Sequence, residues 1–448
     1  MRKITAILFT VVVGFFVVST TIAQVRVTPL NFKERFLANG LKVITLPDKS
    51  TPQVTVQVWY RVGSKDDPKG RSGFAHMFEH MMFKSTKNMK SEMFDRITED
   101  VGGFNNASTY DDFTNYYQVI PSNHAEVLLW AEAERMVNLN VSEETFVSER
   151  DVVKEEFRQR ILANPYGMLF GQYLEKLSYT THPYQRPGIG NLDELQAATP
   201  SDAREFYQTY YRPDNAVLIV VGDFEQTQLD GWVDKYFGKI AKPSGAIPRV
   251  TVSEPERTKE VRHSVSAPNV PFPAVAITYL APKGNSSDVA ALQIASSIMS
   301  GGDSSRMYQE LVYKQQIAQQ AQFSTDIRAD RGLLYFLAIM AGDKKPEDGE
   351  KALLAELKKM QTGLVTAKEL AKAKNQLISQ SISSRETVDG KADQIGFAEM
   401  WGGNAKTVNT YITELQSVTA QDVQRVMKKY FTDTNRVVIY YTNKENSK

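Results

Sequence analysis

The chain has 448 residues, enough for two or more domains, and its apolar and charged fractions (42% and 23%) are those of an ordinary globular protein. Its 53 basic and 52 acidic residues nearly cancel, so charge gives no reason to expect binding to nucleic acid or to an anionic membrane surface. The absence of cysteine excludes disulfides, thiolate metal ligands and cysteine nucleophiles. Any metal must therefore be held by histidine, aspartate or glutamate.

The first 23 residues have the layout of a secretory signal peptide. The basic pair Arg2 and Lys3 precedes an apolar run over residues 4–18, and small residues occupy the positions that a signal peptidase prefers before Gln24. An uncleaved membrane anchor is the alternative, but the run is short for a membrane span. We therefore expect residues 1–23 to be removed, and the mature chain to be periplasmic or secreted without stable insertion in a membrane.

The N-terminal half, over residues 24–240, shows strand patterns followed by helix patterns. Alternating apolar residues predict four strands, over 41–47, 53–62, 103–109 and 113–120. Helical periodicity fills much of 122–178 and 225–237. This order indicates an α+β domain.

Within this half, the stretch "HMFEH" contains two of the chain's five histidines, His76 and His80. No helix breaker follows Gly73, and Ser72 can cap a helix, so the segment is predicted to be helical. Residues four apart share one helix face, which brings the two imidazoles together, and Glu79 lies on nearly the same face. Such a histidine pair is a zinc clamp, and the glutamate is placed to take a proton from zinc-bound water, as in inverzincins. The alternative is a pair of partly exposed histidines with an ion-pairing glutamate.

A catalytic zinc site uses three protein ligands and one open position, so a third ligand is needed. The other three histidines lie in unrelated contexts, which leaves a carboxylate. In the predicted helix over 148–160, Glu149 and Glu156 lie seven residues apart on one face. Glu156 borders an apolar stripe that includes the valines at 152–153, where an unpaired carboxylate is costly. We expect Glu156 to be the third ligand and Glu155 to face solvent; the alternative is an ordinary charged helix face.

Residues 241–254, "AKPSGAIPRVTVSE", are rich in Pro, Ser and Gly without a helical period, and predict a linker. The segment that begins at Leu195 matches the segment that begins at Leu415 without a gap. Each has a threonine cap, an amphipathic helix that ends in aromatic residues, a turn and a β-branched strand. So long a period indicates two domain-sized halves and not a solenoid.

The second half, over residues 255–448, repeats the order of strands before helices, with a strand over 273–282 and helices over 286–300 and 346–401. The predicted fold is therefore α+β, with two duplicated domains of similar topology. Each domain is expected to be a largely antiparallel sheet covered by helices. The metal motif occurs only in the first.

The stretch "GFAHMFEHMMFKST", followed by Glu156 in "ERDVVKEE", resembles the pitrilysin or insulinase family of zinc metallopeptidases. It is most similar to the two-domain branch of the mitochondrial processing peptidase beta subunit and the bacterial heterodimeric peptidases. The resemblance covers nearly the whole mature chain. It implies one Zn²⁺ per chain, bound by His76, His80 and Glu156. It also implies that Glu79 is the general base and that Glu149 supports the site from outside the ligand set.

The stretch "GGFNNASTYDDFTNYY" resembles the substrate-binding strand of that family. The resemblance implies that Asn106, Ala107 and Thr109 lie along the edge of this strand. An extended peptide would pair there through its backbone, which gives affinity largely independent of side chains.

The chain departs from the family pattern in its second half. Active relatives of this branch often carry an arginine six residues, and a tyrosine thirteen residues, after the arginine that corresponds to Arg306. These positions hold Val312 and Gln319, and Tyr313 is one residue out of place. The resemblance therefore implies the zinc-bearing subunit of a heterodimer, whose homologous partner supplies the arginine and the tyrosine.

Two other hypotheses remain. A non-catalytic scaffold or chaperone-like subunit would bind extended peptides, but the intact zinc residues argue against it. A self-sufficient homodimeric peptidase would lack the arginine and tyrosine in every copy.

Overall fold

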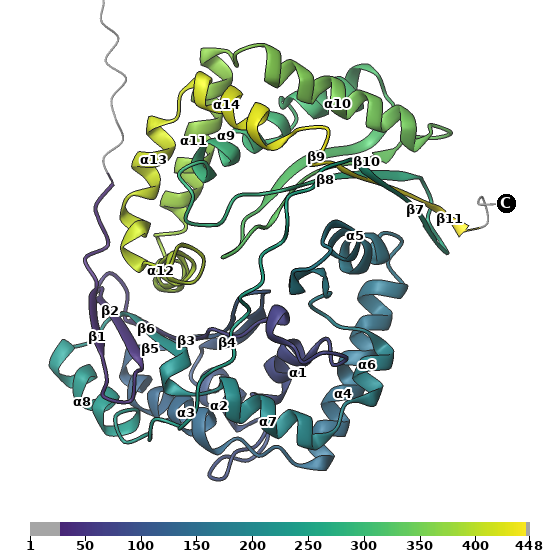
Figure 1. The fold of residues 1–448 in the computed structure, drawn as a ribbon. Helices are drawn as coiled ribbons and strands as arrows, with labels where there is room; N and C mark the ends of the chain where they lie inside the picture. Colours follow the sequence, from purple (N-terminus) through teal and green to yellow (C-terminus); the bar gives the residue numbers. More distant parts are fainter. Residues whose placement is uncertain (1–26, 445–448) are drawn as a thin grey trace, which may run out of the picture.

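The computed structural model describes residues 27–444, so the predicted signal peptide and its cleavage site lie outside the described residues. Within that range no helix is both long and apolar enough to cross a bilayer. Figure 1 shows two lobes, each a sheet covered by helices, with the first half of the chain below and the second half above.

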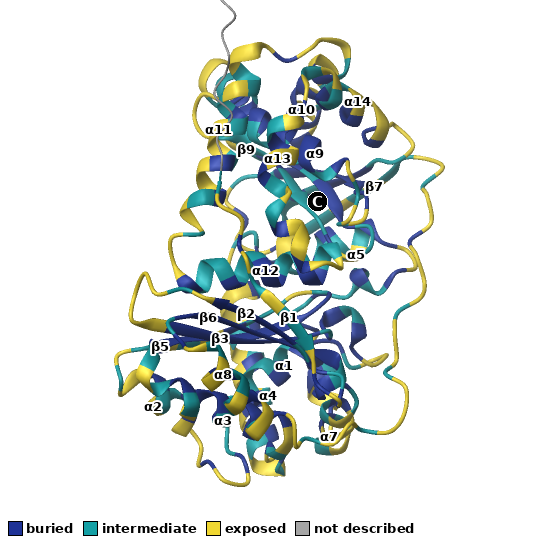
Figure 2. Ribbon diagram, turned by 90° about the vertical axis from the view of Figure 1, so that its left-hand side faces the viewer, coloured by how far each residue is buried: buried dark blue, intermediate teal, exposed yellow. Residues whose placement is uncertain are grey.

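The first sheet has six strands in the order β1-β2-β6-β3-β5-β4. They are β1 (Lys33–Phe36), β2 (Lys42–Pro47), β3 (Gln53–Tyr60), β4 (Phe104–Thr109), β5 (Thr114–Pro121) and β6 (Ala216–Gly222). Neighbours are antiparallel except β2 and β6, which are parallel. The central strands β3 and β6 are buried on both faces (Figure 2). This explains the continuous apolar sequence of β6, whereas β3 also buries the polar residues Thr55 and Gln57. Strand β4 is at one edge.

The second sheet repeats this plan with five strands in the order β7-β11-β8-β10-β9. They are β7 (Val261–Ala267), β8 (Ala274–Leu280), β9 (Ala318–Asp326), β10 (Leu333–Met340) and β11 (Val437–Asn443). Only β7 and β11 are parallel. Without β1, the two orders match strand for strand, with β9 in the place of β4. The predicted duplicated α+β fold is confirmed.

The helices are interspersed with the strands: α1 and α2 lie between β3 and β4, α9 lies between β8 and β9, and the strands β6 and β11 follow most of the helices of their halves. The first half contains α1 (Phe74–Met81), α2 (Met93–Glu99), α3 (Ala125–Asn138), α4 (Glu143–Phe157), α5 (Leu174–Ser178), α6 (Leu192–Ala197), α7 (Pro200–Tyr210) and α8 (Gln226–Tyr236). The second contains α9 (Val289–Ser300), α10 (Pro346–Thr362), α11 (Ala367–Ser383), α12 (Val388–Gly402), α13 (Tyr411–Ser417) and α14 (Ala420–Tyr430).

The internal repeat is visible in matched hydrogen bonds. Thr199 caps α7 and Thr419 caps α14, each in a capping box with an aspartate three residues later. After each helix, an asparagine side chain donates to the carbonyl of the tyrosine five residues before it: Asn215 at 2.9 Å and Asn435 at 2.8 Å. The same residues thus shape the same turn in both halves.

The two halves are joined by more than the segment 241–254, which contains no helix or strand. Helix α12 of the second half packs on the face of the first sheet that is turned towards the second half, where it meets the buried Trp59 and Phe113. Helix α5 of the first half packs on the second sheet, around Leu174 and Tyr441. Both helices lie between the two sheets (Figure 1). The halves therefore share two apolar clusters and form one body.

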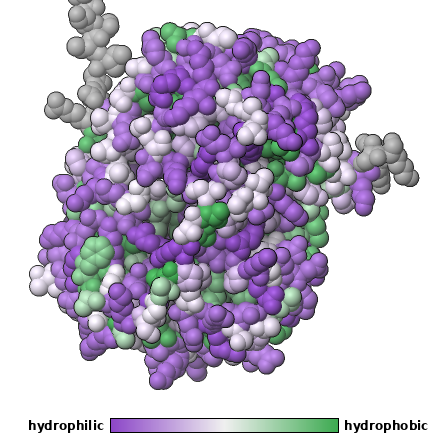
Figure 3. Space-filling model, viewed as in Figure 1, coloured by the Kyte–Doolittle hydropathy of each residue, from purple (hydrophilic) through white to green (hydrophobic). Residues whose placement is uncertain are grey.

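The surface differs from this interior. On the face shown in Figure 3, hydrophilic residues dominate and hydrophobic residues occur in small, separated groups. This distribution is normal for a protein surface in contact with water.

Candidate metal centre

The helix that carries "HMFEH", α1, begins at a glycine held by a distant carboxylate. Gly73 is the residue before the first turn, and its φ of +91° is a conformation that favours glycine. The Asp67 side chain accepts the backbone N–H of Gly73 at 2.7 Å and that of Ala75 at 2.9 Å. The prediction that Ser72 caps this helix was wrong; its N–H donates to Glu194 instead.

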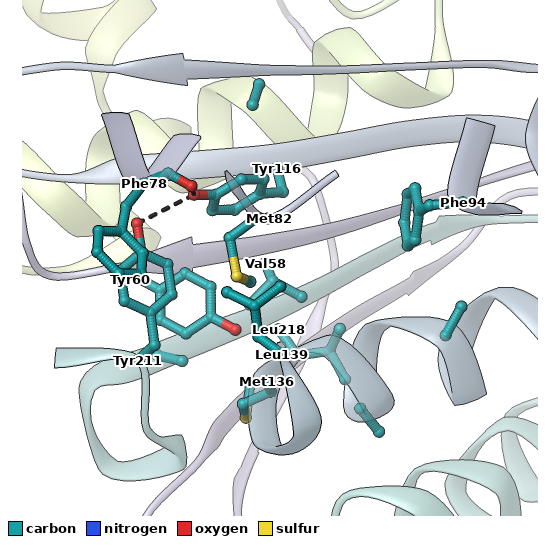
Figure 4. Close-up of a cluster of buried hydrophobic side chains, with 14 of the residues drawn as sticks. Val58, Tyr60, Phe78, Met82, Phe94, Tyr116, Met136, Leu139, Tyr211 and Leu218 are labelled. Carbon is teal, nitrogen blue, oxygen red and sulfur yellow. Dashed lines mark hydrogen bonds between the residues drawn. The ribbon is translucent and has the colours of Figure 1, made fainter. Parts of the chain in front are cut away.

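The opposite face of α1 is fixed in the core of the first half. Phe74, Met77 and Phe78 are fully buried. The Tyr116 hydroxyl donates to the Phe78 carbonyl at 3.3 Å and bonds the Tyr211 hydroxyl at 3.0 Å (Figure 4). Because the apolar face is locked in this way, the half-buried histidine face is directed away from the core.

Helix α4 supplies the carboxylates. The Ser142 hydroxyl caps its first turn, and α4 packs on α1 along the row of Phe146, Glu149 and Val153. Val152 is 46% exposed, so its predicted place in the apolar stripe was wrong. The buried row lies about a quarter turn around the helix from Val152. Glu155 is exposed, and Glu156 is mostly buried beside α1.

Three side chains converge between the two helices. The Oε2 atom of Glu156 lies 3.3 Å from Nε2 of His80 and 3.6 Å from Nε2 of His76. Among residues 27–444 this trio is the one group of metal-ligating side chains whose donor atoms all lie within 4.8 Å of one another. A tetrahedral zinc with bonds of about 2.1 Å places its ligand atoms about 3.4 Å apart. The donor set and its spacing therefore fit Zn²⁺.

The local electrostatics suit a metal as well. Burial, and then the charge of His80, lower the pKa of His76 to about 4, so its imidazole is neutral, as a ligand must be. A hydrogen bond from His80 keeps the pKa of Glu156 below its usual range, despite partial burial. This carboxylate is therefore ionised at neutral pH.

Glu79 points to the same side of α1 but is not one of the three. Burial raises the pKa of its carboxyl group, while hydrogen bonds from Thr109 and the charge of His80 oppose that rise. A carboxylate with a raised pKa beside a metal site is suited to accept a proton and release it again.

Glu149 lies beside His80, on the side of the imidazole that carries Nδ1. Its Oε2 atom is 4.0 Å from Nδ1 of His80, and its Oε1 atom is 3.1 Å from the Lys84 ammonium. Its side chain is 5% exposed. A charged group so deep in the protein needs these partners.

The expected substrate strand is the free edge of the first sheet, because β4 pairs only with β5. The backbone N–H of Ala107 already donates a hydrogen bond to the side-chain oxygen of Asn106, at 2.8 Å. Thr109 turns towards α1, where its hydroxyl is 3.5 Å from the Ala75 carbonyl and its hydrogen bonds reach Glu79. The edge is therefore next to the metal centre, with one N–H covered by a neighbouring side chain.

In the second half, neither of the two positions that the resemblance assigns to an arginine and a tyrosine holds that residue. Val312 lies half-buried in a π-helical turn over Tyr308–Lys314, and Gln319 is exposed on β9. Tyr313 is 68% exposed. The Arg306 guanidinium donates hydrogen bonds to both carboxylate oxygens of Glu369, at 2.7 and 3.0 Å.

Family comparisons match both halves. Residues 42–187 match the model for "Insulinase (Peptidase family M16)", and residues 197–377 match that for "Peptidase M16 inactive domain". The zinc protease PqqE of Helicobacter pylori is 34% identical over 90% of this chain and 91% of its own length. The chain belongs to the insulinase family of zinc peptidases. The match to the inactive-domain model begins in the first half, after the metal motif, and extends over the second half as far as residue 377.

Other relatives and solved structures are similar to this chain over most of its length. The probable mitochondrial-processing peptidase subunit beta of Arabidopsis thaliana is 23% identical over 89% of this chain and 76% of its own length. A crystal structure of a protease from Helicobacter pylori has a TM-score of 0.89 and 32% identity, and covers 93% of this chain and all of that one. A peptidase M16 inactive domain from Pseudomonas fluorescens, with a TM-score of 0.82 and 18% identity, shares the fold.

Sequence reasoning missed three residues around the centre. Asp67 caps α1 from six residues before Gly73, and no local signal marks it. Lys84 and Arg160 contact the two carboxylates of α4. Their spacing from the motif could have suggested them, since Arg160 is four residues after Glu156 on the same helix face.

Proposed function

We propose that this chain is an exported zinc metalloendopeptidase that hydrolyses peptides or small unfolded proteins. The convergence of His76, His80 and Glu156 beside Glu79 is the observation that supports this most. When bound there, Zn²⁺ would polarise the scissile carbonyl and acidify water. Glu79 is the group that would accept the proton of the attacking water and deliver it to the leaving amine.

The free edge of β4 supports an extended peptide as the substrate. A peptide that adds to this edge gains backbone hydrogen bonds beside Glu79 whatever its side chains are. At Ala107 it would displace the Asn106 side chain, which now occupies that N–H. Folded proteins rarely offer such a strand, so unfolded segments are the favoured substrates.

We further propose that a homologous partner chain completes the site. Negative charge develops on the carbonyl oxygen during attack, and loss of one donor for that charge costs about 2.7–4 kcal/mol in hydrolases. Val312 and Gln319 cannot provide a charged donor, and Arg306 is engaged by Glu369. A second copy of this chain would carry the same residues at these positions, so a homodimer would lack the donors as well.

The layout of residues 1–23 supports export and cleavage before Gln24. N-terminal sequencing of the chain recovered from the cell exterior or periplasm checks this. A chain that retains Met1 and stays with the cytoplasm would contradict it.

The decisive experiment uses the mature chain, purified alone, with its zinc content measured. Hydrolysis of an unstructured, internally quenched peptide is followed with and without a homologous chain that carries the arginine and tyrosine. We expect weak hydrolysis alone and a large gain with the partner. Full activity alone would favour the homodimer, and none in either case would favour a peptide-binding scaffold.

A further inference from the structure

Two carboxylates of α4, Glu149 and Glu156, each lie between a histidine and a cation. Glu156 turns Oε2 to the histidines, while its Oε1 lies 2.7 Å from the Arg160 guanidinium. Glu149 turns Oε2 towards Nδ1 of His80 at 4.0 Å, while its Oε1 lies 3.1 Å from the Lys84 ammonium. In each carboxylate, one oxygen contacts the cation and the other oxygen faces a histidine of the metal centre.

We propose that Arg160 and Lys84 are positioning residues of the metal centre. Each fixes one oxygen of a carboxylate so that the other meets a histidine ligand in a single orientation. This inference rests on the proposed function, because it assigns roles around the zinc site. It concerns metal affinity and not only turnover, so it can be tested without a substrate.

The backbone holds Arg160 in place. Helix α4 ends at Phe157, and a π-helical turn over Arg158–Leu162 continues it, with the Ala163 N–H bonded to the Arg158 carbonyl at 2.8 Å. Gly167 packs against this turn so closely that a Cβ atom there would lie 2.6 Å from the Arg160 carbonyl oxygen. The turn therefore cannot move freely, although the Arg160 side chain itself is 73% exposed.

Lys84 is held from the other helix. It follows α1, with its backbone N–H donated to the Met81 carbonyl at 3.0 Å. The side chain of its partner Glu149 is 5% exposed, against 14% for Glu156, and a charged carboxylate at that depth depends on its cation. The Lys84–Glu149 pair should therefore matter more than the Arg160–Glu156 pair, which solvent and salt screen.

The balance of charges around the centre also indicates that Arg160 and Lys84 support metal binding. Glu79, Glu149 and Glu156 place three carboxyl groups around the two imidazoles. Without the two cations, the carboxylates repel each other and are free to turn to water. Loss of an outer partner of a metal ligand typically lowers affinity about 10–100-fold.

The test measures zinc affinity of the mature full-length chain by competition with a chromophoric chelator. We expect Arg160→Gln to lower affinity about 10-fold and Lys84→Gln towards 100-fold. The conservative variants R160K and K84R should restore most of each loss. The salt dependence of zinc affinity should be weaker in Arg160→Gln than in the wild type.

Two matched variants control for charge and position. Arg158 pairs with the exposed Glu155 at 3.1 Å, two residues from Arg160, and Lys87 is exposed three residues after Lys84. Arg158→Gln and Lys87→Gln should keep affinity within about twofold, as expected for solvated charges.

Thermal unfolding of the metal-free proteins separates positioning from folding. Apo Arg160→Gln should unfold at the wild-type temperature, because its side chain is mostly exposed, so its affinity tests the inference even if Lys84→Gln is unstable. Affinity losses no larger than those of the controls would overturn the inference and leave the proposed function intact. A wild-type chain that binds no zinc would overturn the proposed function.

Discussion

The substitution Glu79→Gln separates proton transfer from metal binding at this centre. Glutamine has nearly the same shape and can still accept the hydrogen bonds from Thr109, but it cannot take a proton. Glu79 is not one of the three converging donors, so zinc should stay bound. Hydrolysis should fall about 10²–10⁴-fold, which is the usual contribution of a general base. That range is about 2.7–5.4 kcal/mol of activation free energy.

The raised pKa of Glu79 also decides whether the substitution Glu79→Gln stabilises or destabilises the metal-free fold. Burial raises the pKa of Glu79 in the folded chain, so the folded state holds the proton more tightly than the unfolded state. Ionisation of this group therefore destabilises the fold as pH rises from the unfolded pKa through the folded one. At pH 7 the neutral glutamine removes that cost. The metal-free variant should unfold at or above the wild-type temperature.

The assay combines zinc analysis, hydrolysis of a quenched peptide with any required partner, and thermal unfolding after chelation. For Glu79→Gln we expect one zinc per chain, a loss of turnover and no loss of stability in the metal-free state. Near-normal turnover would remove Glu79 from the mechanism. Loss of zinc or a large drop in apo stability would show that Glu79 acts as a ligand or a structural group instead.

Three further predictions follow from the same geometry. Glu156→Gln should weaken zinc binding far more than Glu155→Gln in a competitive titration, and equal losses would contradict the ligand assignment. Asn106→Ala should lower the KM for an unstructured peptide by freeing the Ala107 N–H, because no side chain then competes with substrate; a raised KM would show that Asn106 binds the peptide. Chelation should lower the unfolding temperature, since free zinc at 1,000 times Kd stabilises the folded state by about 4.1 kcal/mol; an unchanged temperature would mean that no zinc binds the native chain.

Local patterns predicted the elements that carry the site. His76 and His80 share a face because any helix places residues four apart together, and Glu156 follows from the same geometry. The duplicated halves were visible because the repeat keeps the same capping threonines and the same turn asparagines. These signals lie within about 30 residues of sequence.

Long-range contacts could not be predicted in this way. The cap on α1 comes from Asp67, across a loop, and not from the adjacent Ser72, which the sequence favoured. Strands β1, β7, β9 and β10 were not predicted. The parallel pairing of β2 with β6 depends on segments more than 150 residues apart. The packing of α12 on the first sheet also depends on tertiary structure, because its sequence does not reveal which sheet it covers.

X-ray absorption at the zinc edge of the purified mature chain tests the central claim most directly. The account predicts one zinc per chain with two imidazole nitrogens and a carboxylate oxygen at about 2.0–2.2 Å, and with no sulfur ligand. The oxygen shell should change in Glu156→Gln. A chain that binds no zinc, or a zinc without two imidazole ligands, would contradict the account.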